Sequence, residues 1–65
     1  MELTKKFIKL PTVMDLTGYR RTSIYQKVAE GTFPAPVKLG PRAVGWLSTE
    51  IDAWIDERVA ERDAV

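Results

Sequence analysis

Residues 16–25 read Leu16-Thr17-Gly18-Tyr19-Arg20-Arg21-Thr22-Ser23-Ile24-Tyr25, and this stretch predicts two short helices joined by a tight turn. Gly18 is expected to end the first helix, because glycine readily takes the left-handed conformation that follows many helix ends. The second helix is expected to run from about Arg20 to Glu30, with Gly31 after it. It opens with two arginines, two hydroxyls and a tyrosine, a surface that suits phosphates and base edges.

A basic hairpin is predicted further along, in Val37-Lys38-Leu39-Gly40-Pro41-Arg42-Ala43-Val44-Gly45-Trp46. Alternating residues indicate a strand over 37–39, a turn at 40–42 and a return strand over 44–46. Its apolar side chains are expected to point inward or to pack across the hairpin: Val37, Leu39, Val44 and Trp46. Lys38 and Arg42 should point outward. A helix-turn-helix followed by a basic hairpin is the outline of a winged helix-turn-helix domain, a mainly α fold with a small β-hairpin.

The other segments complete one predicted domain, residues 1–65. Residues 1–9 are expected to form an arm or a short edge strand, residues 12–30 the helix-turn-helix and residues 37–46 the wing. Thr12 is expected to cap the first helix, with Asp15 completing a capping box. The core face of that helix should carry Val13, Leu16 and Thr17. Two prolines in the segment 33–36 predict a rigid connector with Phe33 buried.

A last helix is predicted over residues 48–62, with Ser48 as its N-cap. Its apolar stripe follows helical spacing and consists of Ile51, Trp54, Ile55 and Val59. The large apolar residues Phe33, Trp46, Ile51 and Trp54 are expected to form the core rather than to stack on bases, because a domain this small needs them for burial.

Charge divides the chain into two unequal parts. Residues 1–45 carry eight Lys and Arg against three Asp and Glu, a net charge of +5. Residues 46–65 carry two against six, a net charge of −4, so the total is +1. A basic body with an acidic last helix favours a polyanion on one face, since local potential matters more than total charge.

The composition argues against an enzyme. The chain contains no cysteine and no histidine, so we expect no disulfide, no metal site and no cofactor. Asp52 and Asp56 are spaced for acid–base chemistry, but no nucleophile or metal ligand accompanies them, and a solvated acidic face is the simpler interpretation. No apolar run is long enough for a membrane span or a signal peptide, so we expect a cytoplasmic protein with no membrane partner.

Double-stranded DNA is the partner that these residues predict. The second helix can lie in the major groove, where Arg21 can pair with guanine and Gln26 with adenine. Tyr25 can bind a phosphate or pack against the hairpin. In the competing interpretation, the hydroxyls only cap the helix and the arginines are solvated. The predicted DNA-binding residues are Arg20, Arg21, Thr22, Ser23, Tyr25, Gln26, Lys27, Lys38 and Arg42.

The chain resembles the AlpA-type prophage regulators, small DNA-binding proteins related to MerR-like winged helices and phage excisionases. The matching stretches are LTGYRRTSIYQKVAEGTFPAPVKLGPRAVGW and LSTEIDAWIDERVA, preceded by LPTV. The resemblance implies a regulator of prophage or mobile-element genes, with residues 21, 22, 23 and 25 on the recognition helix and residues 38 and 42 on the wing. Family members commonly have serine where this chain has Arg20. We therefore expect Thr17, or a water molecule, to share in capping the second helix.

Three functions fit this reading. The first is a sequence-specific transcription regulator. The second is an excisionase-like architectural factor that bends DNA and recruits an integrase. The third is a protein-interaction module that uses the acidic last helix without DNA. Because one domain of this size covers only part of the contact area of a specific DNA site, we expect a dimer or several copies side by side.

Overall fold

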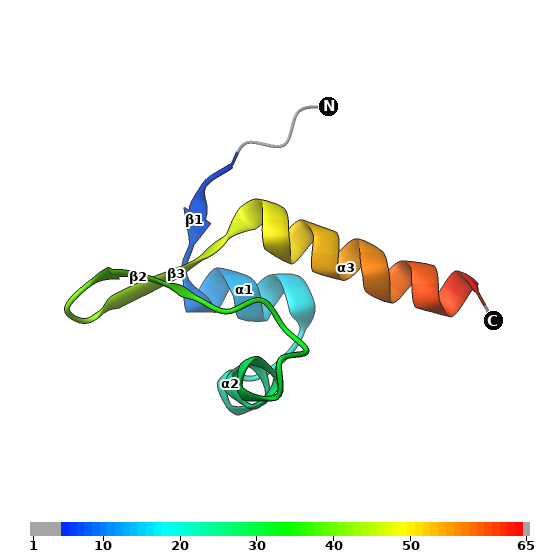
Figure 1. Ribbon diagram of the computed structural model, residues 1–65, viewed down its shortest axis with the longest axis horizontal. Coiled ribbons are helices and arrows are strands. Elements are labelled where there is room, and N and C mark those ends of the chain that lie inside the picture. Colours follow the sequence, from blue (N-terminus) through cyan, green and yellow to red (C-terminus); the bar gives the residue numbers. More distant parts are fainter. Residues whose placement is uncertain (1–4, 65) are drawn as a thin grey trace.

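In the computed structural model, the described residues, 5–64, form three helices and a small sheet (Figure 1). Of the predicted arm, residues 1–4 lie outside the described part. The elements in chain order are β1 (Phe7–Ile8), α1 (Leu10–Thr17), α2 (Arg21–Glu30), β2 (Val37–Gly40), β3 (Ala43–Leu47) and α3 (Ser48–Asp63). Helix, turn, helix and then hairpin follow one another as predicted, and the fold is a winged helix-turn-helix.

The sheet has two faces with different roles. Its order is β1-β3-β2, and both pairings are antiparallel. Ile8 pairs with Trp46, and both are buried on the inner face toward the helices. Val37 pairs with Gly45, one residue away from Trp46, so alternation places Val37 on the outer face. The inner face belongs to the core, and the outer face does not.

The hairpin corrects part of the sequence prediction. Trp46 is fully buried and Val44 packs against the core, as expected. Val37 and Leu39 do not point inward: they are 38% and 40% exposed. Leu39 packs across the hairpin, the other arrangement that was expected, since a Cβ on Gly45 would lie 2.9 Å from its Cδ1. Val37 and Leu39 face outward because Val37 pairs with Gly45, which lies on the outer face. A bulge between Lys38 and Gly40 then interrupts the pairing.

The first helix begins earlier than predicted. Its N-cap is Lys9, whose carbonyl oxygen accepts a hydrogen bond from the Val13 N–H at 3.1 Å. Thr12 lies inside the helix, so the predicted capping box is wrong. Pro11 occupies the first turn, where a missing N–H costs nothing, and the helix can therefore start before it.

Leu16 is 52% exposed rather than buried. The core side of α1 carries Leu10, Val13 and Met14, and helical spacing turns Leu16 away from that side. Thr17 is half-buried and its hydroxyl donates to the Val13 carbonyl oxygen at 2.8 Å. Gly18 then ends α1 at φ 76°, as predicted.

The last helix spans nearly the predicted range, but its N-cap and the exposure of Val59 differ from the prediction. Its N-cap is Leu47, and Ser48 is the first helical residue. The Ser48 hydroxyl instead accepts a hydrogen bond from the Lys6 N–H at 3.1 Å, which ties the start of β1 to α3. Val59 is 42% exposed rather than buried, because the second half of α3 extends beyond the body of the molecule (Figure 1).

A small core connects these elements. Its buried members among the described residues are Ile8, Val13, Ile24, Phe33, Trp46 and Ile51. Burial of Phe33, Trp46 and Ile51 confirms the sequence prediction. Trp54 is half-buried at the edge, with its ring 4.9 Å from Phe33.

Two indole N–H groups hold the connector between α2 and β2. Trp46 Nε1 donates to the Pro34 carbonyl oxygen at 2.8 Å, and Trp54 Nε1 donates to the Thr32 carbonyl oxygen at 2.9 Å. Residues 31–36 form no strand or helix. These hydrogen bonds therefore fix where the hairpin begins relative to α2.

Replacing Trp46 by phenylalanine tests this tether. Trp46→Phe is expected to lower the free energy of unfolding by about 1–3 kcal/mol, because the Pro34 oxygen loses its donor away from bulk water. Trp54→Phe is the matched control and should cost less, since its hydrogen bond is exposed and water can replace the donor. Urea unfolding followed by far-ultraviolet circular dichroism measures both. Equal losses would contradict a special role for the Trp46 tether.

Candidate nucleic-acid interface

Helix α2 presents a polar side to solvent. Ile24 is fully buried and Val28 packs against the core, so these two residues mark its inner side. Successive helical residues are turned by about 100°, which places Thr22 and Gln26 on the opposite side. Both are exposed. A helix with this division can enter a groove with its polar side while its apolar side remains in the core.

The N-terminus of α2 lacks a side-chain cap. Arg20 is the N-cap residue, in extended conformation, and makes no capping hydrogen bond. Thr17 was expected to share in capping α2, but it does not. Its hydroxyl accepts a hydrogen bond from the N–H of Tyr19, which precedes the helix, at 3.2 Å. Thr22 and Ser23 lie inside the first turn, so they are not N-cap residues. The first N–H groups of α2 are thus available to an anion, which the helix dipole favours.

Arg21 and Tyr25 lie on the side of α2 that faces the hairpin. The Arg21 guanidinium carbon is 6.0 Å from the centroid of the Tyr25 ring. That ring is in turn 6.0 Å from the Trp46 ring, at an angle of 60°. Tyr25 remains 38% exposed. Both interpretations of Tyr25 are therefore compatible with the structure, because it packs on the hairpin and still reaches solvent.

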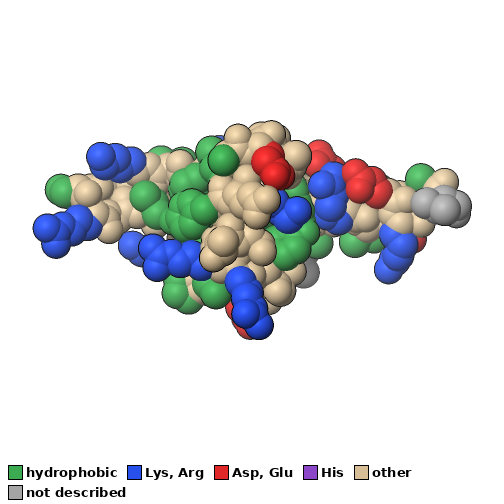
Figure 2. Space-filling model, turned by 90° about the horizontal axis from the view of Figure 1, so that it is seen from below, with side chains coloured by type: hydrophobic (Ala, Val, Ile, Leu, Met, Phe, Trp, Pro, Cys, Tyr) green, Lys and Arg blue, Asp and Glu red, His purple; other side chains and the backbone are tan. Residues whose placement is uncertain are grey.

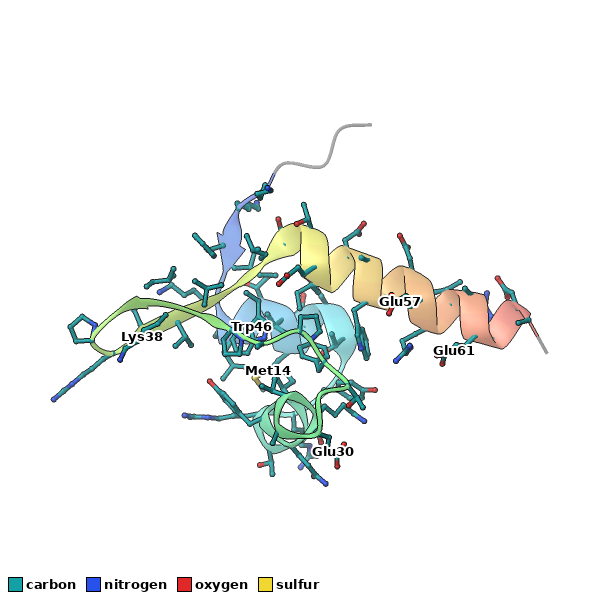
Figure 3. The ribbon with its side chains drawn as sticks, in the orientation of Figure 1. Met14, Glu30, Lys38, Trp46, Glu57 and Glu61 are labelled. Atoms are coloured by element: carbon teal, nitrogen blue, oxygen red, sulfur yellow. The ribbon has the colours of Figure 1, made fainter. Side chains whose placement is uncertain are left out.

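The hairpin carries two exposed cations. Lys38 pairs with Val44, so it lies on the same face of the hairpin as Trp46, the face toward α2 (Figure 3). Arg42 lies in the turn between β2 and β3. Pro41 stiffens that turn. We call Arg21, Thr22, Gln26, Lys38 and Arg42 together the basic face.

Lys27 does not join this set. It is half-buried, and its Nζ atom lies 5.1 Å from the centroid of the Tyr19 ring, on the side of α2 away from Tyr25. Tyr19 itself packs edge-on against Trp54, with ring centroids 5.8 Å apart. The sequence reasoning missed this use of Tyr19. Its only signal was an aromatic residue directly after the helix-ending Gly18.

Gln26 already has a partner in the free protein. Its Nε2 donates to Glu30 Oε2, one turn along the helix, at 3.4 Å. Figure 3 shows Glu30 at the end of α2. This carboxylate is the acidic group of α2, and it lies within reach of the polar side. It adds a negative charge to the surface on which the cations gather.

Charge is distributed unevenly over the molecule. Viewed toward α2, the Lys and Arg side chains gather over the hairpin and α2, and most Asp and Glu side chains lie over α3 (Figure 2). On α3, Arg58 is engaged by Glu61 at 2.7 Å and Glu57 at 3.9 Å. The α3 cations are thus neutralised locally, whereas no salt bridge holds the cations of the basic face among the described residues.

Other kinds of site find little support in residues 5–64. No group of three or more His, Cys, Asp or Glu side chains there could hold a metal ion. No helix in that range is long and apolar enough to cross a membrane. An open depression lies between the connector and α3, lined by residues that include Phe33, Trp54 and Glu57. It lies away from the basic face.

Comparison with known proteins agrees with this geometry. Residues 6–59 match the family described as prophage CP4-57 regulatory protein (AlpA). The chain belongs to the AlpA family. This confirms the resemblance found in the sequence, and the family is one of regulatory proteins rather than enzymes.

Two relatives cover most of this AlpA-family chain. One is the uncharacterized protein ORF88 of Enterobacteria phage P4, 41% identical over 58 residues, which are 89% of this chain and 66% of the relative. The other is the DNA-binding transcriptional activator AlpA of Escherichia coli (strain K12), 36% identical over 59 residues, covering 82% of this chain and 84% of the relative. The chain thus spans just under two thirds of the phage P4 protein.

Among the predicted DNA-binding residues, Tyr25 is expected to stabilise the fold, because its ring contacts Trp46. Tyr25→Ala should lower the free energy of unfolding by about 1–2 kcal/mol, because the contact with Trp46 is lost. Tyr25→Phe keeps the ring and should change stability by less than about 0.5 kcal/mol. Thr22→Ala, at an exposed position of the same helix, is the control and should also be near neutral. Thermal unfolding of the three variants measures the difference, and a neutral Tyr25→Ala would contradict the contact.

Proposed function

We propose that this AlpA-family chain is a DNA-binding regulator of prophage genes that reads its site with α2 and grips the backbone with the hairpin. The observation that carries the proposal is the basic face. Its polar residues on α2 and its cations on the hairpin come from separate segments, and the Tyr25–Trp46 contact fixes one against the other. The DNA-binding role of the Escherichia coli relative supports it.

In this proposal the N-terminal half of α2 enters the major groove. That groove admits an α-helix and displays a distinct donor and acceptor pattern for each base pair. Arg21 offers two parallel donors to guanine, and Gln26 offers an amide to adenine. Thr22 lies between them on the exposed side. The uncapped N-terminus of α2 directs its backbone N–H groups at a phosphate.

The remaining predicted residues act on the DNA backbone. Lys38 and Arg42 project from the hairpin and contact phosphates or the minor groove beside the site. Arg20 adds charge at the start of α2. Ser23 and Lys27 lie on the side of α2 away from the hairpin. From there they can contact only the phosphates on the opposite side of the groove. Such contacts position the helix but carry no sequence information.

Binding also releases Gln26 from Glu30. In the free protein the Gln26 amide donates to the Glu30 carboxylate, so it must exchange that acceptor for a base edge. Because this exchange replaces one hydrogen bond by another, Gln26 adds little to the free energy of DNA binding. Glu30 therefore weakens binding to every sequence, and Gln26 contributes more to choice between sequences than to affinity. A regulator of this kind acts in the cytoplasm, where the bacterial chromosome lies.

Arg21→Ala is expected to weaken binding to the specific site by about 5- to 150-fold, or about 1–3 kcal/mol. The DNA is a site chosen by selection of bound duplexes from a random pool, and the measurement is a mobility-shift titration. The loss should fall mainly on the base pair that Arg21 reads. Arg62→Ala, which removes an exposed cation from α3, is the matched control and should leave affinity unchanged. Equal losses in the two variants would contradict the proposal.

Lys38→Ala is expected to act differently. Affinity should fall by a similar factor for every duplex, because a phosphate contact does not depend on sequence. The slope of log affinity against log salt concentration should decrease by about 1, since one fewer counterion is released. A loss confined to the specific site, with an unchanged salt slope, would place Lys38 against a base instead.

Glu30→Gln is expected to strengthen DNA binding. Removing one negative charge near the phosphates should raise affinity roughly threefold at low salt, and the gain should shrink as salt screens the charge. Glu57→Gln makes the same change on α3 and should have no effect. A titration in which Glu30→Gln binds no better than the parent chain would contradict the placement of α2 against DNA.

The excisionase-like function uses the same basic face, so DNA shape distinguishes it from simple regulation. A circularly permuted set of duplexes carrying the selected site reports the bend. An architectural factor should produce a bend whose position tracks the site and should retain an integrase on the same duplex. Straight DNA supports the regulator alone.

A further inference from the structure

The outer face of the sheet is apolar and uncovered. Phe7 is 48% exposed, Leu39 40% and Val37 38%. Leu39 and Phe7 lie over Gly45, since a Cβ there would meet Leu39 Cδ1 at 2.9 Å and Phe7 Cβ at 3.2 Å, and Val37 is the strand partner of Gly45. We call Phe7, Val37, Leu39 and Gly45 the outer sheet face. α1 and α2 pack on the other side of the sheet, so DNA bound at α2 leaves this face free.

Cations border the outer sheet face. The backbone around β1 is extended, and alternation places Lys5 and Lys9 on the same side as Phe7. Both lysines are exposed. The face therefore suits a partner with apolar side chains surrounded by carboxylates.

One side of α3 has this chemistry. It carries Asp52, Asp56, Val59 and Asp63, which follow one another at helical spacing along the helix, and we call these residues the aspartate stripe. Val59 is 42% exposed. Asp63 pairs with Arg62, but no described cation lies within ion-pair distance of Asp52 or Asp56. Glu57 and Glu61 lie on the other side of α3, where Arg58 engages them.

The outer sheet face and the later part of the aspartate stripe, from Asp56 to Asp63, lie toward opposite ends of the molecule. The sheet and hairpin occupy one end of its longest dimension, 43 Å, and the end of α3 occupies the other (Figure 1). A contact between them is therefore head-to-tail, and it can repeat from copy to copy. Copies bound one DNA turn apart are separated by about 34–36 Å, within the reach of one molecule.

We propose that the outer sheet face is a docking surface for a second copy of this chain, whose aspartate stripe covers it, so that copies on adjacent DNA sites bind cooperatively. The inference rests on the proposed DNA-binding function. Lys5 and Lys9 of one copy meet Asp52 and Asp56 of the next, and Val59 lies against Phe7 and Leu39. The patch is small, so the contact is weak in free solution and strengthens when DNA raises the local concentration.

Two-site DNA tests the proposal. The probes are duplexes with one selected site, with two sites one turn apart, and with two sites one and a half turns apart. The parent chain should bind the second site about tenfold more tightly at one-turn spacing. At the longer spacing the copies lie on opposite sides of the duplex, and this gain should disappear.

Charge reversal identifies the surfaces. Asp56→Lys and Lys9→Glu should each reduce the cooperative gain to about onefold and leave single-site affinity nearly unchanged. A chain carrying both changes should regain it, because the opposite charges meet again. Glu57→Lys makes the same charge change on the other side of α3 and should keep the gain. Lys9→Glu should not harm folding, since a carboxylate suits the start of α1.

The outcomes separate the two proposals. Single-site binding without any cooperative gain overturns the docking surface and leaves the DNA-binding function intact. Absence of single-site binding overturns the DNA-binding function. The docking surface is then decided without DNA, by amide chemical shifts of the whole chain at rising concentration. Shifts at both Leu39 and Val59 support it, whereas shifts at neither, or at one surface alone, overturn it.

Discussion

The position of Trp46 is the constraint on which the rest of the structure depends. Its side chain is fully buried, its backbone pairs with Ile8, its indole donates to Pro34, and its ring contacts Tyr25. One residue thus joins the first strand, the connector and α2 to the hairpin. In a core of so few buried side chains, no second residue can supply all these contacts. The distance between α2 and the hairpin is therefore set by the packing of one aromatic side chain.

Much of this fold could be predicted because glycine and proline mark its boundaries. Gly18 and Gly31 both adopt positive φ and end their helices where expected. The prolines of the connector likewise exclude helix. The helix starts were harder. Pro11 is compatible with a start at Lys9 or at Thr12, and only the hydrogen bond between Val13 and Lys9 decides between them.

Side-chain direction was less predictable than element type. Val37 and Leu39 alternate as an inward-facing strand should, but period two alone does not say which face is inward. The pairing of Val37 with Gly45 decides it, and pairing is a long-range property. The same difference holds for the candidate DNA-binding residues: their helix could be predicted, but the surroundings of each side chain could not. Arg21, Thr22 and Gln26 could be placed on α2 from the sequence, whereas the separation of Lys27 required the position of Tyr19.

The division of charge now has a structural explanation. A chain of 65 residues cannot cover both faces of its sheet or both ends of its last helix. The cations on α2 and on the inner side of the hairpin face one direction, and the carboxylates of α3 lie away from it. If those carboxylates lay beside α2, they would repel the same phosphates that the cations attract. In the proposed arrangement, their placement on a projecting helix keeps them near the next molecule rather than near the DNA. A small domain can then use its cations for nucleic acid and its uncovered apolar and acidic surfaces for its neighbours.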